Sequence, residues 1–155
     1  MHTIRLRGPW EYLPLARFVA AGDGPLTTDT ADLPPGGRIQ LPGNWTSKLG
    51  DFVGRVRFTR FFNRPTGLEN GEVVWLVVEP PQTCGAISLN GRDLGTVAGG
   101  QPPARFDVSP WLLDRNKLIV EVECPKFTTR FHEPSQSPAG GMVGEVRLEM
   151  ELPQW

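Results

Sequence analysis

The chain has 155 residues, with 16 basic and 17 acidic side chains and a formal net charge of −1 at pH 7. A chain of this length suits one domain with a single hydrophobic core, so we expect one domain over residues 1–155. The near-neutral charge provides no basic stripe for nucleic acid and no polybasic anchor for a membrane. No run approaches the roughly 18 apolar residues that span a bilayer. We therefore expect neither nucleic acid nor a membrane as a partner.

The two cysteines, Cys84 and Cys124, are too few and too far apart for a zinc-binding pattern. The residues after Met1 lack the cationic start and apolar run of a secretion signal. We expect two reduced thiols in a cytoplasmic protein, with no cofactor and no metal.

The 18 glycines and 16 prolines are spread along the chain and leave few windows long enough for a helix. Residues 20–37 lack periodicity and are expected to form a long connecting loop. The next segment, "RVRFTRFF" (55–62), places Val56, Phe58 and Phe62 on one face, as in a strand of a sandwich.

Two apolar segments follow in the middle of the chain. "VVWLVVEP" (73–80) is rich in β-branched residues and predicts a buried strand that ends at a proline pair. "AISLNGRDLGTV" (86–97) contains Asn90-Gly91, a pair that tolerates the positive φ angles of a type I′ turn. Its two flanks are therefore predicted to pair as an antiparallel hairpin.

The last third of the chain predicts one helical turn and two strands. "SPWLLDRN" (109–116) offers the turn, and Asp107 just before it is expected to accept backbone N–H groups. "KLIVEVE" (117–123) and "EVRLEMEL" (145–152) alternate apolar and charged residues. Many short strands with frequent turns predict an all-β fold, namely an antiparallel β-sandwich or jelly roll.

The order of short motifs resembles the sugar-binding jelly-roll domain that opens glycoside hydrolases of family 2, a galactose-binding-like sandwich. The resemblance covers nearly the whole chain. The motifs are Gly8-Pro9-Trp10, "LPGNW" (41–45), "GRVRFTRFFNRP" (54–65), "VVWLVVEPPQTCGAISLNGRDLG" (73–95), "FDVSPWLLDRNKLIVEVECP" (106–125) and "GGMVGEVRL" (140–148).

The resemblance implies that hydrolysis belongs to a separate α/β barrel of about 250 residues, which the 155 residues do not contain. Some members extend an acidic residue and an arginine from just before the final strand toward the barrel's sugar pocket. Here Gly144 stands near the position of that arginine, and Glu133 is the acid of the region. We carry no catalytic role over and expect no hydrolytic activity.

Candidate sugar-binding residues lie in two loops, residues 45–52 and 127–136. In the first, Trp45 offers a face for the CH side of a sugar ring, and Phe52 is expected to face the solvent. The alternative for Trp45 is a structural one, in which it packs beneath the turn at residues 42–43 and seals the core.

In the second loop, Arg130, Phe131, His132 and Glu133 follow one another. A cation, an aromatic ring, an imidazole and a carboxylate on one loop suit a polar ligand. The alternative is an ordinary charged loop. If a ligand exists, we expect a neutral or mildly acidic sugar, bound weakly.

Two functions therefore remain open. One is a non-catalytic carbohydrate-binding module. The other is a structural or interaction module that contacts a protein partner or copies of itself through an edge or a face. Fold alone does not decide between them.

Overall fold

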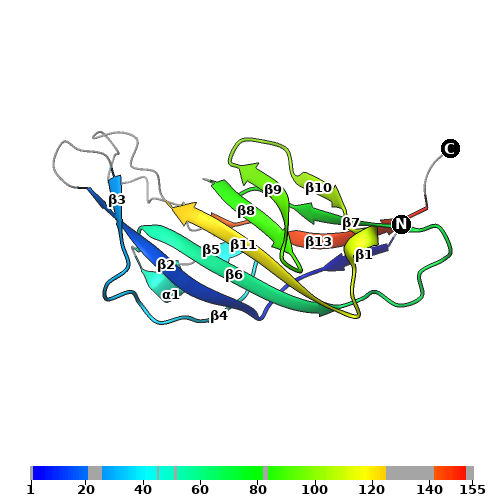
Figure 1. The fold of residues 1–155 in the computed structure, drawn as a ribbon, viewed down its shortest axis with the longest axis horizontal. Helices are drawn as coiled ribbons and strands as arrows, with labels where there is room; N and C mark the ends of the chain where they lie inside the picture. Colours follow the sequence, from blue (N-terminus) through cyan, green and yellow to red (C-terminus); the bar gives the residue numbers. More distant parts are fainter. Residues whose placement is uncertain are drawn as a thin grey trace.

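The computed structural model describes residues 2–20, 26–44, 46–50, 52–81, 84–124 and 142–152. Within these ranges the elements are strands, apart from the short helix α1 (Thr46–Leu49) and the 3-10 turn η1 (Ser109–Trp111). The strands form two antiparallel layers around a shared core, so the chain is an all-β antiparallel sandwich, as the sequence predicts (Figure 1). None of the helices in the described ranges is long and apolar enough to cross a membrane.

The first sheet has the strand order β1-β13-β7-β10, and all its pairs are antiparallel. Its inner face carries the apolar residues that the sequence patterns predict, including Val74, Leu76 and Leu148. The strands are β1 (His2–Arg5), β13 (Val146–Glu151), β7 (Val73–Val78) and β10 (Ala104–Asp107).

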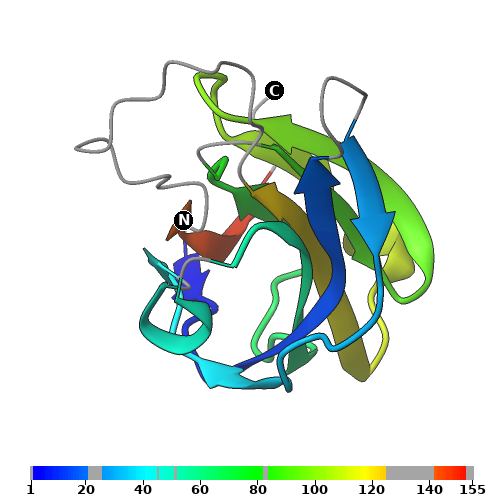
Figure 2. The same ribbon diagram turned by 90° about the vertical axis from the view of Figure 1, so that its left-hand side faces the viewer.

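The second sheet has the order β3-β2-β6-β11-β8-β9, and β4 also pairs with β2. Figure 2 views the sandwich end on and shows β2, β6 and β11 crossing side by side. A separate small pair joins β12 (Met142–Val143) to β5 (Gly43–Asn44). The strands of the second sheet are β2 (Trp10–Ala20), β3 (Leu26–Asp29), β4 (Gly37–Ile39), β6 (Gly54–Asn63), β8 (Cys84–Leu89), β9 (Arg92–Ala98) and β11 (Arg115–Cys124).

One expectation about the first 40 residues is wrong. The segment 20–37 is not a continuous loop, because β3 lies within it and β4 begins at its end. The sequence analysis also makes no prediction for residues 10–20, where β2 runs. Pro14 makes β2 hard to recognise in the sequence, since a proline inside a strand removes one backbone hydrogen-bond donor from the sheet. The structure accommodates it at an irregularity, where the register with β6 shifts between Pro14 and Ala16.

The hairpin at Asn90-Gly91 is confirmed. It joins β8 to β9, and its central residues have φ angles of +53° and +82°. The Asn90 side chain also accepts the backbone N–H of Lys117 at 2.8 Å and donates to the Trp111 carbonyl at 3.1 Å. The turn is therefore tied to β11 and to η1.

Replacing Gly91 by valine should lower the free energy of unfolding by about 1–2 kcal/mol, the cost of a left-handed conformation for an L-residue. A Cβ at this position meets no atom within 4 Å, so the cost comes from φ alone. Urea titration measures the change. Thr96→Val, on the exposed side of β9, is the matched control. Equal stability of the two variants would contradict the assigned turn.

That both cysteines are reduced thiols stays a prediction. Cys84 places its sulfur 3.7 Å from Oε2 of Glu123 on the neighbouring strand β11. The side chain of Cys124 lies outside the described residues.

Candidate binding surface

The structure tests the sequence-predicted sugar site in one residue only. Trp45, Arg130, Phe131, His132 and Glu133 lie outside the described residues. They remain predictions.

Phe52 does not face the solvent, and that expectation is wrong. Its side chain is 7% exposed and belongs to the hydrophobic core. Its backbone N–H bonds to the Leu49 carbonyl at 3.2 Å, which closes a turn after α1. The ring lies beside Gly54, where a Cβ would stand 2.9 Å from it. The missing side chain of Gly54 therefore provides the space that the Phe52 ring fills.

Asp107, by contrast, has the predicted structural role. Its carboxylate accepts the backbone N–H of Ser109 at 3.0 Å and so begins η1. The Ser109 hydroxyl oxygen in turn accepts the N–H of Val74 at 2.8 Å. This carboxylate stabilises a turn that connects to β7.

The described residues form a hollow of about 520 Å³ where β1, β2, β4, β6 and β11 meet. We call it the arginine hollow, because four arginines line it together with Glu11, Thr59 and Phe61. Its volume falls in the range of about 300–1,000 Å³ that is common for small-molecule sites. The four arginines are Arg5, Arg38, Arg60 and Arg115.

Strand register explains how residues far apart in the sequence meet here. Arg38 on β4 is the partner of Glu11 on β2, and Glu11 is the partner of Thr59 on β6. Neighbouring strands lie about 4.8 Å apart, so these three residues span roughly 10 Å across the sheet. Phe61 lies two residues beyond Thr59 on the same face, because side chains alternate along a strand.

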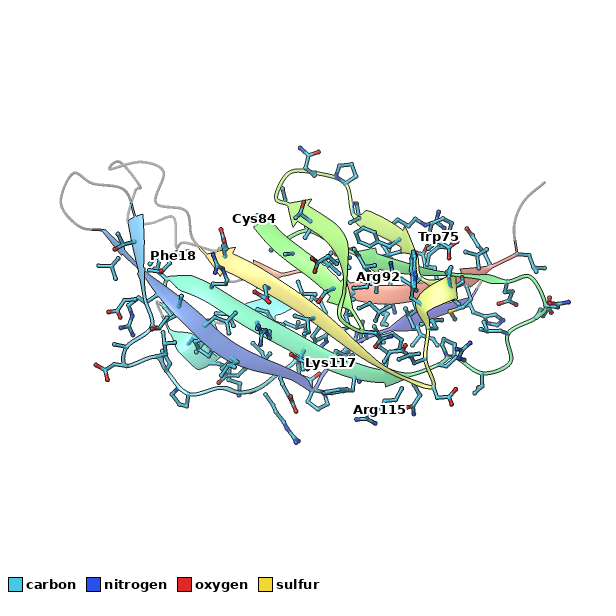
Figure 3. The ribbon with its side chains drawn as sticks, viewed as in Figure 1. Phe18, Trp75, Cys84, Arg92, Arg115 and Lys117 are labelled. Atoms are coloured by element: carbon cyan, nitrogen blue, oxygen red, sulfur yellow. The ribbon has the colours of Figure 1, made fainter. Side chains whose placement is uncertain are left out.

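β11 supplies the opposite wall of the hollow. Its residue Lys117 is the partner of Phe61, and the Arg115 guanidinium lies 5.0 Å from the centroid of the Phe61 ring. Figure 3 labels Arg115 and Lys117 near the start of β11. Phe61 therefore lies between the two cations of β11, Arg115 and Lys117, and Arg38 on β4.

The charges in the hollow are not balanced. Arg5 pairs with Glu145 at 3.3 Å, and Arg60 donates to the backbone carbonyls of Arg7 and Phe61. In the described part of the chain, Arg38 and Arg115 form no ion pair, and neither does Glu11. Apart from Arg5, which Glu145 balances, one acid thus shares the hollow with three guanidinium groups, and this excess favours anions in the concave surface.

A second hollow, of about 430 Å³, adjoins the first. It shares Glu11, Arg38, Thr59 and Phe61 with the arginine hollow, and it adds Lys117 among its further lining residues. The two hollows together give one groove, with Phe61 common to both. The second sheet lines most of it, and Ile4, Arg5 and Leu148 of the first sheet line part of it.

The arginine hollow lies toward the Asn63 end of β6 and the Arg115 end of β11. Arg115 pairs with Asn63 at one end of the two strands, and Cys124 pairs with Gly54 at the other. Ten paired residues correspond to about 30 Å of strand. Residues 127–136 come after Cys124 in the sequence and lie outside the described residues.

The outer face of the first sheet carries a network of ion pairs. Arg147 Nε lies 2.8 Å from Oε2 of Glu149, and Arg147 NH1 lies 3.4 Å from Glu79. The hydrogen bond to Glu149 is the main cause that raises the pKa of Arg147 above its ordinary value. Because a raised pKa of a base adds stability below its unfolded pKa, this contribution is lost only at strongly alkaline pH. Arg147 therefore stays a cation at any ordinary pH.

A second arginine extends this network to the edge of the sheet. The Arg105 guanidinium lies 2.7 Å from Glu151 and 4.1 Å from the centroid of the Trp75 ring. Glu79, Glu149 and Glu151 are therefore paired with arginines, as carboxylates with a structural role are.

Sequence reasoning missed the arginine hollow because three of its strands, β1, β2 and β4, were not predicted. Arg38 lies on β4, directly after the segment 20–37 that is expected to be a loop, while Glu11 lies on β2 and Arg5 on β1. One signal was available in "RVRFTRFF", where Phe61 falls on the face opposite Val56 and Phe58. An aromatic residue on the polar face of a strand is a candidate contact.

Comparison with known proteins gives structural likeness only. No family model and no curated protein matches the chain. Among solved structures, a Bifidobacterium dentium β-glucuronidase complexed with coumarin-3-O-glucuronide superposes with a TM-score of 0.66 at 21% identity. It covers 96% of this chain and 30% of its own.

Two further structures agree. A calcium-binding mutant of Bacteroides uniformis β-glucuronidase 2 has a TM-score of 0.68 at 20% identity and covers 97% of this chain and 18% of its own. A putative β-galactosidase from Bacteroides fragilis has a TM-score of 0.65 at 18% identity, with 97% and 23% covered. At these identities the likeness establishes the fold. The chain spans less than a third of the length of these three enzymes.

Proposed function

We propose that the chain is a non-catalytic carbohydrate-binding module that resembles the sugar-binding domain of family 2 glycoside hydrolases. In this proposal residues 1–155 form one galactose-binding-like jelly-roll domain. The observation that carries it is the match of nearly the whole chain to a β-sandwich portion of β-glucuronidases. The order of motifs noted in the sequence supports the same family.

The arginine hollow is the described surface best suited to hold a sugar. Phe61 offers an aromatic side chain, which suits the CH face of a pyranose, and the surrounding polar side chains suit its hydroxyls. Trp45, Arg130, Phe131, His132 and Glu133 are a second proposed contact area. An open site exchanges water hydrogen bonds nearly one for one, so we expect dissociation constants near the millimolar range, about −4 kcal/mol.

We predict that the isolated chain does not hydrolyse glycosides. Hydrolysis needs two carboxyl groups about 5–10 Å apart across a cleft, one of them able to give a proton. The glutamates of the first-sheet network are instead paired with Arg147 and Arg105. Nitrophenyl glucuronides, galactosides and mannosides should remain intact. Turnover that survives repurification and disappears in Glu133→Gln or Asp107→Asn would contradict the prediction.

A glycan array followed by saturation-transfer NMR tests the binding role. We expect signals from at least one class of sugar at tens of millimolar. If no glycan binds and a stoichiometric protein partner is recovered instead, the interaction module replaces this proposal.

One observation favours that second candidate. In the described part of the chain, β1 is one of the two edge strands of the first sheet, and all four of its residues are exposed. An edge strand presents unpaired backbone groups to another chain.

A further inference from the structure

We propose that the arginine hollow selects acidic saccharides, with an anionic group on the sugar bound by Arg38 while the ring lies against Phe61. The anionic group is a carboxylate, as in a uronate, or a sulfate ester. This inference rests on the proposed carbohydrate-binding function and specifies the class of sugar.

The side chain of Arg38 has hydrogen-bond donors without partners among the described residues. A guanidinium binds carboxylate or sulfate oxygens through two parallel hydrogen bonds, and these are stronger than bonds between neutral groups. Among the described residues, Arg38 has neither an ion pair nor a hydrogen bond to satisfy its side chain. Its strand partner Glu11 lies on the same hollow but forms no ion pair with it. The guanidinium of Arg38 is therefore available to a ligand.

Further positive charges surround Arg38. Arg115 and Arg60 line the same hollow as Arg38, and Lys117 lines the adjoining one. None of these three cations forms an ion pair within the described residues. The whole chain has a net charge of −1, so the excess of cations here is local. A concave surface with charge of one sign concentrates ligands of the opposite sign.

The aromatic ring separates a sugar site from a simple anion site. Phe61 is half-buried on the outer face of β6 and lines both hollows. Inorganic phosphate or sulfate gains nothing from a phenyl ring, whereas the CH face of a pyranose does. Arg38 and Phe61 thus recognise two different parts of one ligand.

Four probes test the proposal by two-dimensional NMR titration of the full chain at low salt. They are methyl β-glucuronoside, glucose 6-sulfate, neutral methyl β-glucoside and inorganic phosphate. We expect at least one of the two acidic sugars to bind about tenfold tighter than the neutral sugar, a difference of about 1.4 kcal/mol. The stronger of the two identifies the anionic group. Raising the salt to about 0.5 M should remove most of this preference, since ions screen exposed charges.

Four variants assign the effect to residues. Arg38→Ala should abolish the tenfold preference and leave the neutral sugar unchanged, and Arg38→Lys should restore part of it. Glu11→Gln removes the acid of the hollow and should strengthen acidic-sugar binding about threefold. Phe61→Ala should weaken acidic and neutral sugars alike. Arg92→Ala is the control. Arg92 lies on β9 against the ring of Trp111, so this variant makes an equal change of charge away from the hollow and should leave sugar binding unchanged.

Three outcomes would overturn the inference. Acidic and neutral sugars bind equally, Arg38→Ala behaves like Arg92→Ala, or inorganic phosphate binds as tightly as the best acidic sugar and is unaffected by Phe61→Ala. If sugars bind at residues 45–52 or 127–136 instead, the proposed function stands and this inference fails. If no sugar binds anywhere, both fail.

Discussion

Replacing Trp10 by alanine is expected to lower the free energy of unfolding by about 4 kcal/mol, which is typical of a large buried aromatic residue. Trp10 is 0% exposed and lies in the core between the two sheets. Its indole N–H also donates to the Leu6 carbonyl at 2.7 Å, just before the chain enters β2. The variant leaves a cavity and removes the partner of that carbonyl.

Urea denaturation followed by circular dichroism measures this loss. Trp10→Phe fills most of the space and removes only the indole donor, so it should cost less, about 1–2 kcal/mol. Leu13→Ala, on the same strand but 49% exposed, is the control and should cost under about 1 kcal/mol. Similar losses for Trp10→Ala and Leu13→Ala would show that Trp10 is not a core residue.

The second large effect is expected at Asn116. Its side chain is 0% exposed and makes four hydrogen bonds with three residues. Nδ2 donates to the carbonyls of Leu113 at 2.9 Å and Phe62 at 3.3 Å. Oδ1 accepts the N–H of Leu113 at 2.8 Å and Nδ2 of Asn90 at 3.0 Å. This one residue therefore links the turn before β11, the end of β6 and the β8–β9 hairpin.

Asn116→Ala should lower the free energy of unfolding by about 3 kcal/mol, because it leaves several polar groups without partners. Asn116→Asp is nearly isosteric but has no donor, so it should not restore the stability. Asp114→Ala is the control, since that side chain is fully exposed two residues away. A loss at Asn116 no larger than that of the control, measured in the same urea titrations, would refute the role assigned to its hydrogen bonds.

Much of the fold could be predicted from the sequence, because local patterns determine the middle and last strands. Val56 and Phe58 alternate with arginines, and both are fully buried on β6. Asn90-Gly91 forms the expected turn, since few other residue pairs accept two positive φ angles. The patterns did not predict β1 to β4 or β10. Pro14 interrupts β2, and β3 and β4 form by pairing with β2 rather than from local propensity.

The candidate site was much harder to predict. Arg38, Glu11, Phe61 and Arg115 come from four strands, and only the pairing order brings them together. Sequence reasoning favours loops, where polar and aromatic residues cluster visibly, and so it selected residues 45–52. Phe52 shows the weakness of that approach. Its ring packs inward beside Gly54, where the missing side chain leaves room for it. The residue type of Phe52 alone does not reveal this packing.

Mapping backbone amide shifts of the ¹⁵N-labelled chain with saturating sugar is the decisive test of whether this sandwich binds carbohydrate in the arginine hollow. We expect the largest shifts to cluster at Glu11, Arg38 and Phe61 and at residues 115–117. Residues of β10, such as Arg105, line neither hollow and should stay unchanged. Shifts confined to residues 45–52 and 127–136, or no shifts at tens of millimolar sugar, would contradict binding in the arginine hollow.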